Sequence, residues 1–132
     1  MNKKVILVAL LLGAFLQAPA GAQPAAGAAP STSIGGFAEE GVAAWYGRKF
    51  AGRRTASGKR FNPEAMTAAH PSLPFGARVR VTNLENDRQV VVTINDRGPT
   101  TPGRIVDLSL GAARKLGMVR KGIADVRLEG LD

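Results

Sequence analysis

The sequence predicts a mainly β fold, a small six-stranded barrel with one short helix. Apolar and polar residues alternate along the segments 78–82, 88–95 and 124–128, as they do in strands with one buried face. Glycines and prolines lie between these segments and favour turns over long helices. A barrel suits such short strands because it closes on itself and leaves no exposed strand edge.

Six segments are expected to form the strands: 41–46, 66–70, 78–82, 88–95, 104–108 and 124–128. The third and fourth segments form a hairpin, because Glu85, Asn86 and Asp87 between them are typical turn residues. The last segment alternates again, so the chain closes on another half-buried strand.

One helix is expected directly after Ser109, which is a typical N-cap residue. Leu110, Ala113 and Leu116 follow at the spacing that places apolar side chains on one face of a helix. Gly117 is suited to end the helix, because glycine readily adopts the left-handed conformation found there.

The N-terminal segment 1–22 has the pattern of a cleaved signal peptide. Two lysines precede the apolar run 5–16, and small residues follow it. The run is shorter than the roughly 20 residues of a membrane-spanning helix. We expect cleavage after Ala22, with Ala20 as an alternative, and a periplasmic or secreted protein without a membrane anchor.

Composition divides the rest of the chain into a linker and one domain. Residues 23–40 are rich in Ala, Pro and Gly, which predicts a flexible linker, and residues 41–132 suffice for a single domain. The chain has no cysteine, so it carries neither a lipid on cysteine nor a disulfide. Its formal net charge of +8 falls to +6 without the two lysines of the signal. Export makes a cell-wall polymer or a membrane surface a better partner for this charge than nucleic acid.

The run Asn95-Asp96-Arg97-Gly98-Pro99 is the clearest candidate for a functional site. It follows an alternating strand, so Asp96 is expected at the mouth of a β scaffold, where a carboxyl can serve acid–base chemistry. The alternative is that Asp96 only ties the turn through main-chain N–H groups.

Several motifs in order along the chain resemble the RlpA (rare lipoprotein A) family. They are Gly41-Val42-Ala43-Ala44-Trp45-Tyr46-Gly47, Thr55-Ala56-Ser57-Gly58, Thr67-Ala68-Ala69-His70, Leu73-Pro74-Phe75-Gly76, Val79-Arg80-Val81-Thr82-Asn83-Leu84, Asn95-Asp96-Arg97-Gly98-Pro99 and Arg104-Ile105-Val106-Asp107-Leu108-Ser109. The resemblance covers nearly all of residues 41–131. It implies a double-psi β-barrel, the fold of expansins and of some lytic transglycosylases, and peptidoglycan as substrate.

The resemblance also implies catalytic residues. The family's acid falls on Asp96 and its histidine on His70, and Asp107 is similar to an acid in the groove of expansin-like barrels. His70 either orients Asp96, binds sugar or packs at a strand end, and we favour the first. Asp107 has a simpler alternative, because it lies two residues before the helix cap Ser109 and can stabilise the helix start.

Substrate binding is assigned to five residues: Trp45, Tyr46, Thr55, Lys59 and Arg97. Neighbours on a strand point to opposite faces, so one of Trp45 and Tyr46 belongs to the core and the other, Tyr46 by preference, to the groove. Arg97 either binds a carboxylate of the substrate or forms a surface salt bridge. Lys59 stands where many relatives have a glutamate. Near Asp96 its ammonium would lower the pKa of the acid, whereas a lysine that faces solvent would do little.

We expect an endolytic lytic transglycosylase that cleaves the MurNAc–GlcNAc bond and leaves 1,6-anhydro ends. One carboxyl suffices, because the C6 hydroxyl of the muramic acid replaces water as the nucleophile, and we assign this role to Asp96. The alternatives are a non-catalytic, expansin-like wall-binding module and a secreted adaptor that binds another protein. His70 is the only histidine, which excludes a multi-histidine metal site. We expect no cofactor and a monomer.

Overall fold

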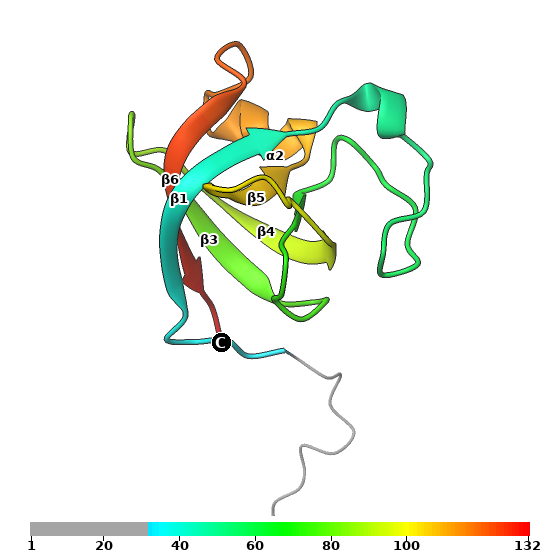
Figure 1. Cartoon of the computed structure of the whole chain (residues 1–132), viewed down its shortest axis with the longest axis horizontal. Helices are drawn as coiled ribbons and strands as arrows, with labels where there is room; N and C mark the ends of the chain where they lie inside the picture. Colours follow the sequence, from blue (N-terminus) through cyan, green and yellow to red (C-terminus); the bar gives the residue numbers. More distant parts are fainter. Residues whose placement is uncertain (1–31) are drawn as a thin grey trace, which may run out of the picture. The chain divides into compact units, whose positions relative to one another are not determined.

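The computed structural model describes residues 32–132, which form a closed six-stranded β-barrel with one short α-helix (Figure 1). Its elements in chain order are β1 (Ala38–Trp45), the 3₁₀ helix η2 (Arg48–Phe50), β2 (Thr67–Ala69), β3 (Arg78–Asn83), β4 (Gln89–Asp96), β5 (Arg104–Leu108), α2 (Leu110–Lys115) and β6 (Ile123–Gly130). The segment between β1 and β2 projects to one side of the barrel (Figure 1).

The strands follow one another around the barrel in the order β1-β5-β2-β4-β3-β6. Two neighbouring pairs, β1 with β5 and β2 with β4, are parallel, and the other pairs are antiparallel. The apolar residues of each strand that alternate toward the interior make the core. They include Val79, Val81, Val92, Ile94, Val106, Leu108, Val126 and Leu128, each at most 1% exposed.

The predicted mainly β barrel is confirmed, and each of the six expected segments contains a strand. The expected start of the compact domain at residue 41 is corrected, because β1 begins at Ala38. Ile34 and Phe37 already pack against the core, so residues 34–40 are not a free linker. The expected signal peptide and most of the linker lie outside the described residues.

Helix α2 begins as the sequence predicts. The Ser109 hydroxyl accepts a hydrogen bond from the Ala112 amide at 3.1 Å and donates one to the Ala65 carbonyl at 2.6 Å. Gly117 follows the helix with a φ of +68°, which glycine adopts without strain. Among the described residues no helix is both long and apolar enough to cross a membrane.

Replacing Ser109 by alanine is expected to lower the free energy of unfolding by about 1 kcal/mol. The change removes the cap of α2 and leaves the Ala65 carbonyl with the Thr67 amide as its remaining donor. Urea unfolding measures the loss as a lower midpoint with an unchanged m-value. Thr in place of Ser retains the hydroxyl and should recover part of the stability, and an unchanged midpoint in the alanine variant would contradict the capping role.

Candidate active site

Two carboxyl groups meet at one end of the barrel, on either side of the short strand β2. Ala69 of β2 pairs with Asp96 of β4 on one side and with Asp107 of β5 on the other. Residues that pair directly across neighbouring strands point to the same face of the sheet. All three residues line one pocket, and the small side chain of Ala69 leaves the space between the two acids open.

A register shift between β2 and β4 turns Asp96 toward this pocket. Ala68 pairs with Ile94, which faces the core, but Ala69 pairs with Asp96, so Asn95 is an extra residue in β4. Without this bulge, strand alternation would give Asp96 the inward direction of Ile94. The bulge therefore puts Asp96 on the same face as Asp107.

The pocket has a volume of about 340 Å³ and is lined by residues of loops and strand ends. Its lining residues are Tyr46, Phe50, Arg53, Arg54, Thr55, Phe61, Ala69, Asp96, Arg97 and Asp107. Six of the ten come from the segment between β1 and β2. This segment is therefore a wall of the pocket.

One oxygen of Asp96 is held by the main chain. Oδ1 accepts hydrogen bonds from the amides of Ala56 at 2.8 Å and Arg97 at 2.9 Å. The predicted turn-tying role of Asp96 is therefore present, and it coexists with a position in the pocket. The two amides fix the carboxyl group in one orientation.

Asp107 lies in a different environment from Asp96. Burial raises the pKa of its carboxyl, and the charge of Asp96 raises it further, whereas the guanidinium of Arg104 lowers it. Gly98, at a φ of +119° that favours glycine, lies in the turn beside Asp107, where a Cβ would be at an ordinary contact distance of 3.9 Å from Asp107 Oδ2. Asp107 is thus the acid that keeps its proton to a higher pH than a free aspartate.

Tyr46, which directly follows β1, lines the pocket, as its alternation with Trp45 predicts. Its ring stacks on Phe61 at 4.6 Å between centroids and meets Phe50 edge-on at 5.9 Å. Its buried hydroxyl has no hydrogen-bond partner within residues 32–132. Burial and the charges of Asp96 and Asp107 raise the pKa of this phenol, so the hydroxyl stays a donor.

His70 does not bring its ring to the Asp96 carboxyl, which corrects the expected orienting contact. Its Nε2 lies 2.9 Å from Glu39 Oε1, and its Nδ1 accepts hydrogen bonds from the amides of Ser72 and Leu73, both at 3.1 Å. Only its main-chain amide reaches Asp96, at the carbonyl oxygen. The buried ring therefore fixes the turn after β2.

Arg97 and Trp45 are both held by the protein itself. Arg97 Nη1 donates to the carbonyls of Leu73 at 2.8 Å and His70 at 3.3 Å, and its guanidinium lies 4.1 Å from the centre of the Phe75 ring. Trp45 packs against the core and donates from Nε1 to the Val119 carbonyl. Arg97 thus shapes the pocket edge, and Trp45 lies outside the pocket.

Thr55 lines the pocket, whereas Lys59 does not. The Thr55 hydroxyl and amide both bond to the Lys59 carbonyl at 2.8 Å, which closes a tight turn. The Lys59 side chain is exposed, and none of the ion pairs within residues 32–132 joins it to Asp96. The expected alternative in which Lys59 faces solvent is the one observed.

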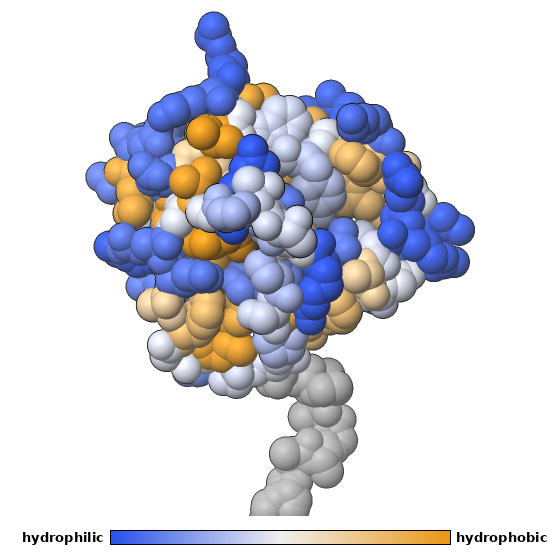
Figure 2. Space-filling model, in the orientation of Figure 1, coloured by the Kyte–Doolittle hydropathy of each residue, from blue (hydrophilic) through white to orange (hydrophobic). Residues whose placement is uncertain are grey.

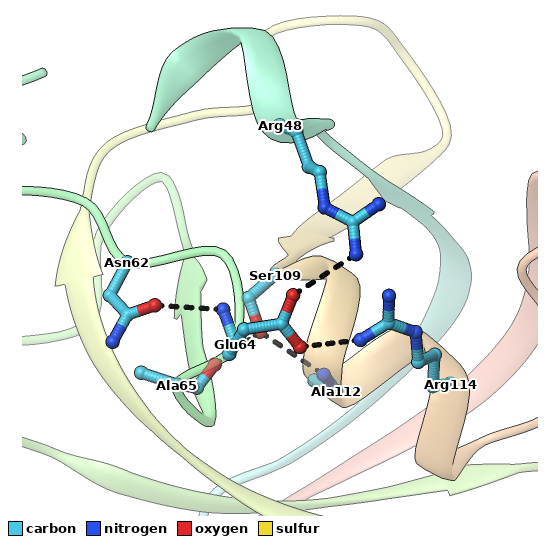
Figure 3. A network of polar contacts seen from close by, with 7 residues as sticks. All are labelled: Arg48, Asn62, Glu64, Ala65, Ser109, Ala112 and Arg114. Carbon is cyan, nitrogen blue, oxygen red and sulfur yellow. Dashed lines mark hydrogen bonds and ion pairs between the residues drawn. The ribbon is translucent and has the colours of Figure 1, made fainter. Parts of the chain in front are cut away.

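Glu64 anchors the far end of the pocket wall to helix α2. Its carboxylate pairs with Arg114 of α2 and, at 3.3 Å, with Arg48 of η2 (Figure 3). The main chain adds a hydrogen bond of 2.8 Å from the Gly111 amide to the Pro63 carbonyl. Sequence reasoning missed the wall residues Phe50, Phe61, Arg53 and Arg54, although the density of basic and aromatic residues in segment 48–61 was a visible signal.

Comparison with known proteins agrees with this fold. The chain is 68% identical over 94 residues to a protein of Nostoc sp. named probable endolytic peptidoglycan transglycosylase RlpA. The aligned residues cover 70% of this chain and 25% of that protein. It is 50% identical over 99 residues to endolytic peptidoglycan transglycosylase RlpA of Pasteurella multocida, covering 75% of the chain and 34% of that protein. The chain thus spans between a quarter and about a third of these two relatives.

Solved structures show the same barrel at low sequence identity. A Streptomyces papain inhibitor superposes with a TM-score of 0.61 at 21% identity, covering 74% of this chain and 96% of the inhibitor. An expansin of Clavibacter michiganensis gives 0.59 at 21% identity, covering 73% of this chain and 51% of the expansin. Residues 38–128 match the family described as lytic transglycolase. The chain therefore belongs to the lytic transglycolase family and carries its RlpA-type double-psi β-barrel domain.

Proposed function

We propose that this chain is an endolytic peptidoglycan lytic transglycosylase that cleaves the MurNAc–GlcNAc bond and leaves 1,6-anhydro-MurNAc ends. The observation that carries the proposal is the pair Asp96 and Asp107 on either side of Ala69 in one open pocket. Family membership and the names of the relatives from Nostoc and Pasteurella support the same reaction.

In this reaction the catalytic acid gives up one proton and later regains one. An acid protonates the oxygen of the departing GlcNAc as its bond to C1 of MurNAc breaks. The C6 hydroxyl of the same MurNAc then bonds to C1 and returns its proton to the carboxylate. No water is consumed, and the acid ends in its starting state.

Asp107 is the better candidate for the acid, because its raised pKa keeps a proton available. Asp96, with Oδ1 fixed by two amides, is suited to stabilise the positive charge that develops at C1. The expectation that Asp96 alone donates the proton stays a prediction beside this division of labour. The division also explains why two carboxyls share the pocket.

The remaining predicted residues act around this pair. Tyr46 and Thr55 line the wall along which the glycan would lie. His70 and Arg97 act as positioning residues, because both hold the turn after β2 beside Asp96. Trp45 fixes the end of β1, which Tyr46 directly follows, by packing against the core.

The site of action follows from the substrate. We propose that the protein works outside the cytoplasmic membrane, after removal of residues 1–22, as a monomer on glycan strands. Neither a cofactor nor nucleic acid has a part in the reaction. Its positive charge would concentrate it near the anionic wall.

Replacing Arg104 by glutamine is expected to extend activity to higher pH. The guanidinium of Arg104 lowers the pKa of Asp107, so its removal raises that pKa. An acid with a higher pKa stays protonated to a higher pH, and the alkaline limb of kcat/KM moves up. Arg88→Gln, with an exposed side chain away from the pocket, should leave the limb unchanged. An alkaline limb that stays in place or moves down would count against Asp107 as the donor.

Digestion of purified peptidoglycan, followed by mass spectrometry of the products, tests the function itself. The expected products are muropeptides with 1,6-anhydro ends. Binding to the wall without any product would instead favour an expansin-like module. A protein that neither cleaves nor binds the wall would fit the adaptor alternative.

A further inference from the structure

The wall of the pocket between β1 and β2 is strongly basic. Residues 48–60 contain six cationic residues and no acidic one: Arg48, Lys49, Arg53, Arg54, Lys59 and Arg60. Hydrophilic residues lie at the outer edge of the projecting side in Figure 2, with pale and tan residues between them and the barrel. Arg53 and Arg54 line the pocket itself, beside Asp96 and Asp107.

Arg53 and Arg54 are positioned without acidic partners. Arg54 Nη1 donates to the Gly58 carbonyl at 2.7 Å, and Arg54 forms an antiparallel bridge with Arg60 across the turn. The Arg53 guanidinium lies 5.6 Å from the centre of the Phe50 ring. Neither side chain belongs to an ion pair within residues 32–132. Most of their N–H donors are therefore available to a ligand.

A catalytic carboxyl pair alone would repel an anionic substrate. Muramic acid carries a lactyl arm on C3, two ring atoms from the C1 at which the bond breaks. The arm ends in a free carboxylate in stripped glycan, and in peptide-bearing glycan it continues into a stem with carboxylates of its own. Guanidinium groups in the same pocket offset the repulsion and match the planar geometry of a carboxylate. A neutral glycan has no carboxylate with which they could form a charged pair.

We propose that Arg53 and Arg54 form a subsite for carboxylates on the lactyl arm of muramic acid. The proposal rests on the proposed function for the identity of the glycan, and it adds the feature by which the pocket distinguishes muramyl glycan from neutral β-1,4 glycans. Salt should weaken the binding of muramyl oligomers, because the exposed guanidinium groups act through screened charge.

Calorimetric binding to three oligosaccharides tests this subsite. All proteins carry Asp107→Asn, so that the ligands stay intact. The ligands are stripped muramyl oligomers, peptide-bearing muramyl oligomers and chitotetraose, which has no carboxylate. The double variant Arg53→Gln/Arg54→Gln is expected to bind muramyl oligomers about tenfold more weakly and chitotetraose unchanged. Arg88→Gln/Arg120→Gln removes the same charge from exposed positions outside the pocket and should change neither.

The ligands separate the two sources of the carboxylate. A loss for stripped oligomers alone assigns the subsite to the free lactyl carboxylate, a loss for peptide-bearing oligomers alone assigns it to the stem, and a loss for both shows that the subsite takes either carboxylate. Three results would overturn the proposal. The double variant would lose as much affinity for chitotetraose as for muramyl oligomers, it would bind every ligand as before, or the protein would not bind muramyl oligomers at all. The products of the unmodified protein test the function separately. If that protein forms anhydro ends while the arginine substitutions change no binding, the lytic activity is supported and the subsite is refuted.

Discussion

Asp107→Asn is expected to lower kcat by about 10² to 10⁴ on peptidoglycan while the protein stays folded. The amide keeps the shape of the side chain but has no acidic proton to donate. Because the folded protein raises the pKa of Asp107, its ionised form destabilises the fold above that pKa. Removing this charge should leave the melting temperature at neutral pH equal or higher. Initial rates and thermal unfolding of the same preparation measure both effects.

Two matched variants identify the cause of the loss. Asp125→Asn removes an exposed carboxyl of β6 outside the pocket and should retain full activity. Asp96→Asn should also lower activity, and it removes a charge that raises the pKa of Asp107. The alkaline limb of its residual activity should therefore move to lower pH. Normal turnover by Asp107→Asn would refute the role of this acid.

Gly111→Ala is expected to lower the free energy of unfolding by about 2 kcal/mol. Alanine favours a helix over glycine by about 1 kcal/mol. Against this gain, a Cβ at Gly111 would lie 2.6 Å from the Glu64 carbonyl oxygen and 2.7 Å from Met66 Cε. This carbonyl belongs to the main chain of the pocket wall that Glu64 anchors, and it can shift only slightly. Overpacking by the added methyl group is therefore expected to lower the free energy of unfolding by about 3 kcal/mol.

Gly47→Ala is the matched control for this stability change. A Cβ at Gly47 meets only Trp45, at an ordinary contact distance of 3.7 Å, and the φ of −94° suits alanine. Its stability should be unchanged or slightly higher, because alanine restricts the unfolded chain. Urea midpoints compare the two variants. A Gly111→Ala protein as stable as Gly47→Ala would show that α2 does not press on the Glu64 main chain.

Local patterns in the sequence were sufficient to predict the elements of the barrel. The alternation of Val90, Val92 and Ile94 requires one buried face, and Ser109 and Gly117 mark the two ends of α2. The order of the strands does not follow from such patterns. The parallel pairs of β1 with β5 and β2 with β4 join segments distant in sequence, and periodicity carries no information on their pairing.

Five of the eight residues that the sequence suggested for the site line the pocket, but most of their contacts could not be predicted. The resemblance to RlpA pointed to both acids. The bulge at Asn95 that turns Asp96 toward Asp107 could not be predicted, because it depends on the register between β2 and β4. Glu39, the partner of the His70 ring, lies 31 residues away in sequence on β1. Arg54 lies in the pocket because a local turn holds it there, and no periodic pattern in the sequence predicts that turn.

Digestion of peptidoglycan in water enriched in ¹⁸O, followed by mass spectrometry of the glycan ends, tests the proposed reaction most directly. Attack by the C6 hydroxyl predicts ends that are lighter than reducing ends by one water and contain no ¹⁸O. Reducing ends labelled with ¹⁸O would show that water is the nucleophile and would contradict the lytic mechanism. An intact glycan would contradict catalysis by the Asp96 and Asp107 pair altogether.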